Sequence, residues 1–215
     1  MRLFTSWSGG KDCTLALYRI LQDNKHEVTH ILNMCDTDNS HSRSHGMPKH
    51  LIAQQAASLG IEILQPVSDF KNYETIFKET IKTLKEKGVA GGVFGDIYLQ
   101  VHRDWIERVC AEMEIQPFFP LWENNTTDLL KEFINDGFKT IVVSVNSKSL
   151  PQSWLGREIN EKFIADILKL EGIDPCAENG EYHSFVYDGP IFKKPVTFSR
   201  GREFFKDNHW FLNLQ

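Results

Sequence analysis

The sequence lacks the features that would place the chain in a membrane or stabilise it by disulfides. None of its 215 residues belongs to an apolar run near the roughly 18 residues that a membrane-spanning helix needs. The first residues do not have the layout of a signal peptide. The four cysteines are far apart and include no Cys-x-x-Cys pair, which excludes a zinc knuckle and predicts free thiols in a reducing compartment. We therefore expect a soluble, cytoplasmic protein with no membrane partner.

Positive charge is also scarce. The 24 Lys and Arg are outnumbered by 29 Asp and Glu, which leaves a net charge of -5 and argues against a nucleic-acid partner that needs an extended basic surface. Internal repeats and low-complexity segments are absent as well. Hydrophobic residues make up 41% of the chain and aromatic residues 12%, and these are sufficient for a sizeable core without disulfides.

Short apolar runs alternate with amphipathic segments over the first half of the chain. The predicted buried strands are 3–7, 27–35, 61–67, 89–96 and 116–121. The segments between them carry apolar residues at helical spacing. In the last of these segments, Ile97, Val101, Trp105, Val109 and Met113 recur every four residues and are expected to face the core. The alternation predicts an α/β fold with right-handed βαβ units and a mostly parallel, Rossmann-like sheet.

The regular alternation ends near residue 122. A capped helix, a further strand and a turn-rich aromatic tail follow it. We therefore expect two domains, a parallel-sheet domain at 1–123 and a smaller α+β domain at 124–215.

The most informative stretch is Ser8-Gly9-Gly10-Lys11-Asp12, between the first predicted strand and the helix after it. Paired glycines let the backbone approach a ligand closely, and a helix N-terminus favours an anion. Lys11 adds a positive charge at the same place. This Ser8–Asp12 loop is therefore predicted to bind phosphate. It is not a Walker A loop, which needs Gly at the position of Thr5 and Ser or Thr at the position of Asp12, and it contains no Gly-x-Gly-x-x-Gly.

Polar residues also follow two other predicted strands. His45 lies in the polar loop 36–46 after the second strand, and Gly95 and Asp96 end the fourth. Open parallel sheets bind ligands at the carboxyl ends of their strands, so we expect these three residues to contact the same ligand as the Ser8–Asp12 loop. Two alternatives stay open: His45 is a plain surface residue, or Asp96 is the N-cap of the following helix.

Two tracts of the chain resemble one enzyme family. The Ser8–Asp12 loop is similar to the PP-loop signature Ser-Gly-Gly-x-Asp-Ser of the ATP pyrophosphatases, with Cys13 at the position of the last Ser. The tract from Asp174 to Phe192 resembles the Cys-Gly-Glu-x-Gly-Glu-(Tyr/Phe)-x-(Thr/Ser)-Phe tract of the diphthine–ammonia ligase family, with Ala177 at the position of the first Gly. Shorter stretches that also look like that family are Ser44-His45-Gly46, Gly95-Asp96-Ile97 with Arg103 and Glu107, and Pro120-Leu121-Trp122.

The resemblance implies an ATP-dependent amide ligase that cleaves ATP between the α and β phosphates. Residues 1–123 would form the ATP-binding domain and 124–215 the substrate-binding domain. The backbone from Ser8 to Cys13 would surround the pyrophosphate, Lys11 would neutralise it, and Asp12 would bind Mg²⁺.

The same resemblance implies two chemical steps. A substrate carboxylate would attack the α-phosphate to form an acyl-adenylate, and ammonia would then displace AMP. Glu178, Glu181 and His183 would lie over the nucleotide and orient the substrate or the ammonia. The carboxylate would belong either to diphthine, which is a modified histidine of elongation factor 2, or to a small metabolite.

Two other functions stay open at the level of sequence. A nucleotide-binding sensor would bind ATP without releasing pyrophosphate. A PP-loop sulfurtransferase acting on tRNA would need a persulfide-carrying cysteine, for which Cys176 is the candidate, and a basic surface, against which the net charge argues. A homodimer is compatible with the sequence, and the source of the ammonia is left undecided.

Overall fold

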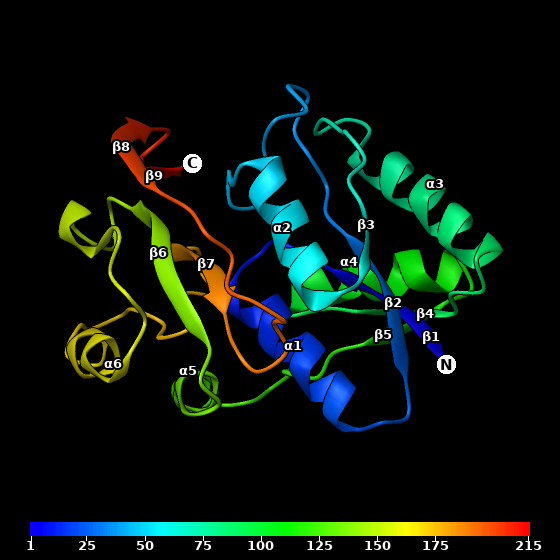
Figure 1. Ribbon diagram of the computed structural model, residues 1–215, viewed down its shortest axis with the longest axis horizontal. Coiled ribbons are helices and arrows are strands. Elements are labelled where there is room, and N and C mark those ends of the chain that lie inside the picture. Colours follow the sequence, from blue (N-terminus) through cyan, green and yellow to red (C-terminus); the bar gives the residue numbers. More distant parts are fainter.

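A five-stranded parallel sheet forms the N-terminal part of the protein (Figure 1). The computed structural model describes all 215 residues. The strands are β1 (Arg2–Ser6), β2 (Glu27–Leu32), β3 (Glu62–Leu64), β4 (Gly91–Val93) and β5 (Gln116–Phe118), in the spatial order β3-β2-β1-β4-β5. This order confirms the predicted Rossmann-like fold. The direction of the strand order changes between β1 and β4, and such a switch point leaves a crevice at the carboxyl ends of the strands.

Four helices cover the two faces of this sheet. They are α1 (Lys11–Gln22), α2 (Lys49–Leu59), α3 (Tyr73–Glu86) and α4 (Gln100–Glu112). Neighbouring residues of a strand point to opposite faces, so Leu3 of β1 packs in a cluster with α1 and α2, whereas Phe4 packs in a second cluster with α3 and α4. Burial on both faces explains why the strands are short apolar runs rather than alternating ones.

The prediction that the apolar residues of α4 all face the core is wrong for Val101, in the first turn of the helix. Val101 is 79% exposed, whereas Ile106, Val109 and Cys110 are buried. The helix begins at Gln100, beyond the carboxyl end of β4, so no strand lies beneath its first turn and only the later turns contact the sheet.

The C-terminal part contains a four-stranded antiparallel sheet in the order β7-β6-β9-β8. Its elements are α5 (Thr126–Asn135), β6 (Lys139–Asn146), the 3₁₀ turn η1 (Gln152–Trp154), α6 (Glu161–Ile167), β7 (Tyr182–Asp188), β8 (Arg200–Lys206) and β9 (His209–Leu214). This confirms the α+β class expected for the second half of the chain. The larger hydrophobic cluster runs from α1 and α2 into β6 and β7 without a break, so the division at residue 123 stays a prediction.

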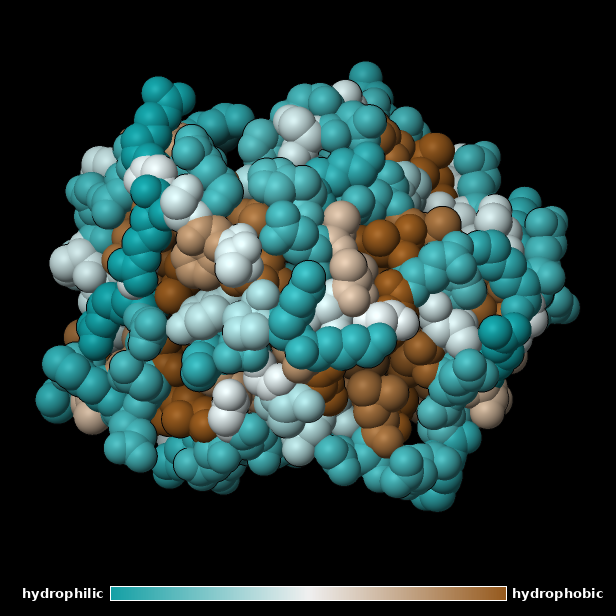
Figure 2. Space-filling view, in the orientation of Figure 1, coloured by the Kyte–Doolittle hydropathy of each residue, from teal (hydrophilic) through white to brown (hydrophobic).

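Hydrophobic residues are concentrated inside the molecule. Figure 2 shows that hydrophilic residues cover its outer edges and that hydrophobic atoms are visible mainly between them. No helix has both the length and the apolar character that crossing a lipid bilayer requires.

Candidate active site

The Ser8–Asp12 loop joins β1 to α1 at the switch point of the sheet. Gly9 has a φ of +85°, a conformation that favours glycine. A Cβ atom on Gly10 would lie 2.5 Å from Cε1 of His45, so only glycine leaves room for that ring. Gly10, the N-cap of α1, has no side chain, and the backbone N–H of Lys11 donates instead to Oγ of Ser184, on β7, at 3.2 Å. The loop therefore has the glycine turn and the helix N-terminus that anion-binding sites use.

Strand β7 lies beside this loop although it is far away in sequence. The backbone N–H of Val186 donates to the carbonyl of Gly9 at 3.0 Å. The side-chain amide of Gln55, on α2, donates to the carbonyls of Gly9 at 3.0 Å and of Val186 at 2.6 Å. These bonds fix β7 against the loop and bring His183 to the end of the parallel sheet.

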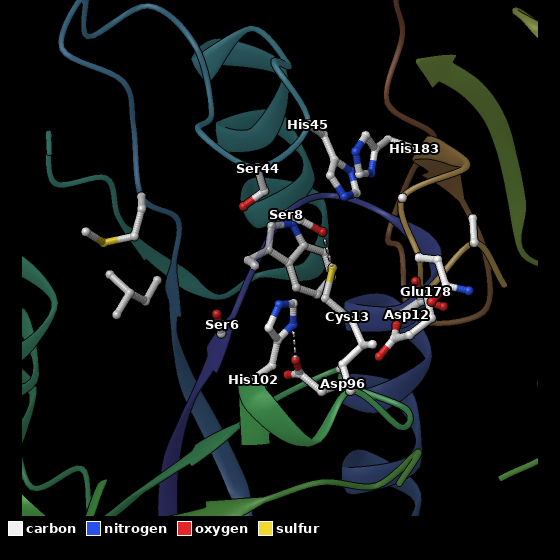
Figure 3. A pocket seen from close by; sticks show the side chains of 18 of the residues that line it. Ser6, Ser8, Asp12, Cys13, Ser44, His45, Asp96, His102, Glu178 and His183 are labelled. Carbon is white, nitrogen blue, oxygen red and sulfur yellow. Dashed lines mark hydrogen bonds and ion pairs between the residues drawn. The ribbon is translucent and has the colours of Figure 1, made fainter. Parts of the chain in front are cut away.

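A cavity of about 540 Å³ opens at this junction (Figure 3). Its walls come from the Ser8–Asp12 loop, the loops after β2 and β4, the start of α4 and the Asp174–His183 tract. Of the residues predicted for the site, those that line the cavity are Ser8, Asp12, Cys13, His45, Gly95, Asp96, Glu178 and His183. Those that lie outside its lining are Gly9, Gly10, Lys11 and Glu181. The fold thus brings the two sequence motifs to one cavity.

Lys11 lies behind the cavity instead of in it. Its side chain is buried, and the ammonium donates to the carbonyl of Cys176 and, at 2.9 Å, to the carboxylate of Asp12. The ring of Tyr182 lies 5.1 Å from the ammonium. Burial alone lowers the pKa of Lys11, but the charge of Asp12 beside it raises that pKa, and the net direction is upward. Lys11 therefore carries its charge and holds the Asp174–His183 tract against α1.

Glu178 lines the cavity and binds the loop after β4. Its carboxylate accepts hydrogen bonds from the backbone N–H groups of Ile97 at 2.8 Å and Tyr98 at 3.4 Å. Burial raises the pKa of the Glu178 carboxyl, and the charges of Asp12 and Asp96 raise it further. Burial raises the pKa of Asp12 too, although Lys11 opposes this. The negative charges of Asp12 and Asp96 beside Glu178 favour a cation in the cavity.

Asp174 and Glu181 form hydrogen bonds that hold the backbone around Glu178 in place. Glu181 is buried, and one of its oxygens accepts from the backbone N–H of Asp174 at 3.0 Å while the other has no partner. The Asp174 carboxylate in turn accepts from the backbone N–H of Glu178 at 2.8 Å. Ala177 has a φ of +59°, a conformation that favours glycine, which is why the family pattern has Gly at this position.

His45 and His183 stack on each other and line the same cavity (Figure 3). Their ring centroids are 4.4 Å apart with an interplanar angle of 27°. Nδ1 of His45 lies 3.1 Å from the carbonyl oxygen of Ser184, and a carbonyl only accepts, so Nδ1 carries the proton. Burial lowers the pKa of His45 to about 4 and that of His183 well below its usual value. Both rings are therefore neutral at pH 7.

The lowered pKa of His45 makes stability depend on pH. Between its ordinary value of 6.5 and about 4, the unfolded chain binds a proton at this residue that the folded chain does not, so stability falls as the pH falls. We expect His45→Gln to show a shallower loss of unfolding free energy from pH 6.5 to pH 4.5, measured by urea titration. His50→Gln, on the exposed side of α2, is the control. Equal slopes for His45→Gln and wild type would contradict the prediction.

Comparison with known families assigns both halves of the chain. The model of the diphthamide synthase N-terminal domain matches residues 1–117, and that of the C-terminal domain matches residues 125–215. The chain belongs to the diphthamide synthase family. It is 27% identical to a diphthine–ammonia ligase of Rattus norvegicus over 92% of this chain and 82% of the relative. It is 34% identical to that of Homo sapiens over 55% of this chain and 46% of the relative.

A solved structure with a related arrangement is described as a predicted subunit of tRNA methyltransferase from Methanocaldococcus jannaschii. The likeness covers 91% of this chain and 100% of the other, with a TM-score of 0.46 and 18% identity.

In this member of the diphthamide synthase family, Cys13 takes the position of the last Ser of the PP-loop signature. Its thiol donates to the carbonyl of Gly10 at 3.2 Å and lies 3.5 Å from Oγ of Ser8. Burial raises the pKa of the Cys13 thiol, which is therefore protonated. The hydroxyl of Thr14 also donates to Gly10, at 2.7 Å, and Thr14 is fully buried, so it offers no hydroxyl to the cavity.

Cys176, the candidate persulfide carrier, is buried as well. Its thiol donates to the carbonyl of Thr126 at 3.1 Å, and it does not line the cavity. Burial raises the pKa of Cys176 despite the nearby charge of Lys11. A buried, protonated thiol is a poor nucleophile, so the structure offers no support for sulfur transfer through Cys176.

His102, in the first turn of α4, is a titratable cavity residue that the sequence reasoning missed. Its Nδ1 lies 3.4 Å from the carboxylate of Asp96, and this hydrogen bond raises the pKa of His102. Asp96 is not the N-cap of α4, which is Leu99. The sequence feature that could have identified His102 is its position in the first turn of the helix that follows Asp96, at the carboxyl end of a predicted parallel strand.

Proposed function

We propose that the protein is an ATP-dependent ligase that joins ammonia to a carboxylate, and that this carboxylate belongs to diphthine. The observation that carries the proposal is that the Ser8–Asp12 loop and Glu178, from opposite ends of the chain, form walls of the same cavity. An anion-binding turn alone would only hold a nucleotide. A carboxylate above it can orient a second, nitrogen-containing substrate against the bound phosphates.

The reaction has two steps. In the first, an oxygen of the substrate carboxylate attacks the α-phosphorus of ATP, the bond to the β-phosphate breaks, and pyrophosphate leaves. In the second, the nitrogen of ammonia attacks the acyl carbon, AMP leaves, and the nitrogen loses a proton. The N–H groups at the start of α1 would stabilise the charge that develops on the pyrophosphate.

The stacked histidines suit this chemistry because they are neutral. The ring of His183 forms no side-chain hydrogen bond within the protein, and it lines the cavity (Figure 3). It can therefore hydrogen-bond to the acyl-phosphate or to ammonia without adding a charge beside the reacting carbon. We assign His183 and Glu178 to the orientation of the nucleophile, with His45 holding the ring of His183 in place.

Mg²⁺ fits the donor set of the cavity as a partner of the phosphates. Asp12 and Glu178 both line it, and the negative charge of Asp12 beside Glu178 supports a cation at this place. No group of three or more His, Cys, Asp or Glu side chains is arranged to hold a metal ion by itself. The ion would therefore take one or two carboxylates together with phosphate oxygens and water, and it would neutralise phosphate charge.

Glu178 provides the test of this function. We expect Glu178→Ala to lower the rate of ATP-dependent amide formation on diphthine-carrying elongation factor 2 about 100-fold. Glu178→Gln keeps an acceptor for the N–H of Ile97 and should keep the fold of the tract, yet lose most of the activity because the charge is gone. The measurement is pyrophosphate and AMP release together with mass spectrometry of the protein product.

Glu171→Gln, in an exposed turn, is the matched control and should be fully active. A wild-type protein that binds ATP but releases no pyrophosphate in the presence of both substrates would be a sensor, and the proposed function would be wrong. Full activity of Glu178→Ala would remove Glu178 from the mechanism.

A further inference from the structure

We propose that the hairpin formed by β8 and β9 is the docking surface for the protein that carries the substrate residue, and that this partner presents an acidic segment to the hairpin. The inference rests on the proposed function, because only a protein-borne substrate needs a docking surface outside the cavity.

The outer edge of the hairpin is an unpaired strand. β8 ends the antiparallel sheet, with β9 on one side and no strand on the other. All of its residues except Gly201 are exposed. The backbone groups along such an edge can add a strand from another chain. The hairpin is also held rigidly, since the carbonyl of Asn208 in its turn accepts from the backbone N–H of Ser147 at 2.9 Å.

Aromatic side chains on this hairpin are exposed. Phe204 stacks on Phe211 with ring centroids 5.2 Å apart, and Phe205 packs against Trp210 at 4.9 Å. Phe204 remains 39% exposed and Phe205 52%. Exposed aromatic rings held in place by a cross-strand neighbour are typical anchors of protein interfaces.

The cations of β8 have no partners within the protein. Arg200, Arg202 and Lys206 form no ion pair with any Asp or Glu of the chain. The carboxylate of Glu203, between them, accepts instead from the side-chain amide of Gln152 at 2.6 Å. Unpaired cations on an edge strand favour an acidic partner.

The same cations disfavour a second copy of this chain as the occupant. If two β8 strands paired antiparallel about Glu203, Arg200 would face Lys206, and if they paired about Phe204, Arg202 would face Lys206. Like charges opposite one another destabilise strand pairing. A nucleic acid is disfavoured by the carboxylates that line the cavity and by the net charge of -5.

The hairpin is continuous with the cavity. The ring of Phe211 lies 3.7 Å from the position that a Cβ atom of Gly46 would take, and Gly46 follows His45, which lines the cavity. His209, on the same strand, is close enough to His183 to act on it electrostatically. A protein bound along β8 can therefore insert one side chain between the two histidines and Glu178.

The test compares two variants with the same change of net charge. Arg202→Glu/Lys206→Glu alters the hairpin, and Lys82→Glu/Lys131→Glu alters exposed positions on α3 and α5. With diphthine-carrying elongation factor 2 as substrate, we expect the first variant to raise the KM for that protein about tenfold. The KM for ATP and the melting temperature should stay as in wild type, and the second variant should resemble wild type throughout.

A hairpin variant with an unchanged KM for the protein, alongside an active wild type, would overturn the docking site and leave the proposed function intact. A wild type that forms no amide would overturn both. A wild type that sediments as a dimer, with a monomeric hairpin variant, would show that β8 binds a second copy. Competition by tRNA for the wild type but not for the hairpin variant would show a nucleic-acid site. Either of these results would overturn the acidic protein partner.

Discussion

Lys11→Met is expected to lower the free energy of unfolding by about 3 kcal/mol. The ammonium of Lys11 is buried between the carboxylate of Asp12 and the carbonyl of Cys176. Its removal leaves both acceptors without their donor, and one of them is deep in the protein. Urea denaturation at pH 7 measures the loss. The same variant should also bind ATP poorly, because the Asp174–His183 tract is no longer held against α1.

Lys82→Met is the control for this prediction. Lys82 is exposed on α3 and forms no ion pair, so its replacement should change stability by less than about 0.5 kcal/mol. Lys11→Met with wild-type stability and no ATP binding would mean that the ammonium turns into the cavity and neutralises phosphate. That result would support the role that the sequence alone predicted for Lys11.

Gly95→Ala should reduce ATP-dependent pyrophosphate release about 100-fold. A Cβ atom at this position would lie 2.8 Å from the backbone nitrogen of Cys13 and 2.9 Å from the carbonyl carbon of Asp12. These are backbone atoms of the first turn of α1, which cannot rotate away as a side chain would. The variant must therefore push the Ser8–Asp12 loop away from the loop after β4.

Gly172→Ala separates this effect from a general loss of stability. A Cβ atom on Gly172 would meet nothing within 4 Å, but its φ of +73° makes alanine unfavourable by about 1 kcal/mol. We expect this variant to have a lower melting temperature than wild type and to release pyrophosphate at the wild-type rate. If Gly95→Ala is as active as Gly172→Ala, the close approach of the two loops is not needed for catalysis.

Features that depend on neighbouring residues were predictable from the sequence. The apolar runs and helical spacing predicted the parallel sheet, because strand and helix periodicity are set locally. The Ser8–Asp12 loop was recognisable because a glycine turn before a helix N-terminus is a local pattern that favours anion binding. The tract around Glu178 was recognisable by its order of residue types, and both family-model matches agree with that assignment.

Features that depend on contacts across the chain were not predictable. Glu178 and Glu181 are three residues apart in one tract, yet one lines the cavity and the other is buried behind it. Val101 matches the spacing of a core position but is exposed because α4 begins beyond the end of β4. His102 enters the site only because the first turn of α4 faces Asp96.

The Ser8–Asp12 loop combines features that follow from the sequence with features that only folding produces. The sequence by itself determined that a glycine turn follows β1, for which it predicts phosphate binding, and that a tract with two glutamates accompanies it in the chain. Only the tertiary structure decided that β7 pairs with the carbonyl of Gly9, that Lys11 faces Cys176, and that Glu178 closes the same cavity. The physical reason is that a buried charged side chain points toward its nearest hydrogen-bond acceptors. Residues far apart in the sequence supply those acceptors, and only folding brings them close.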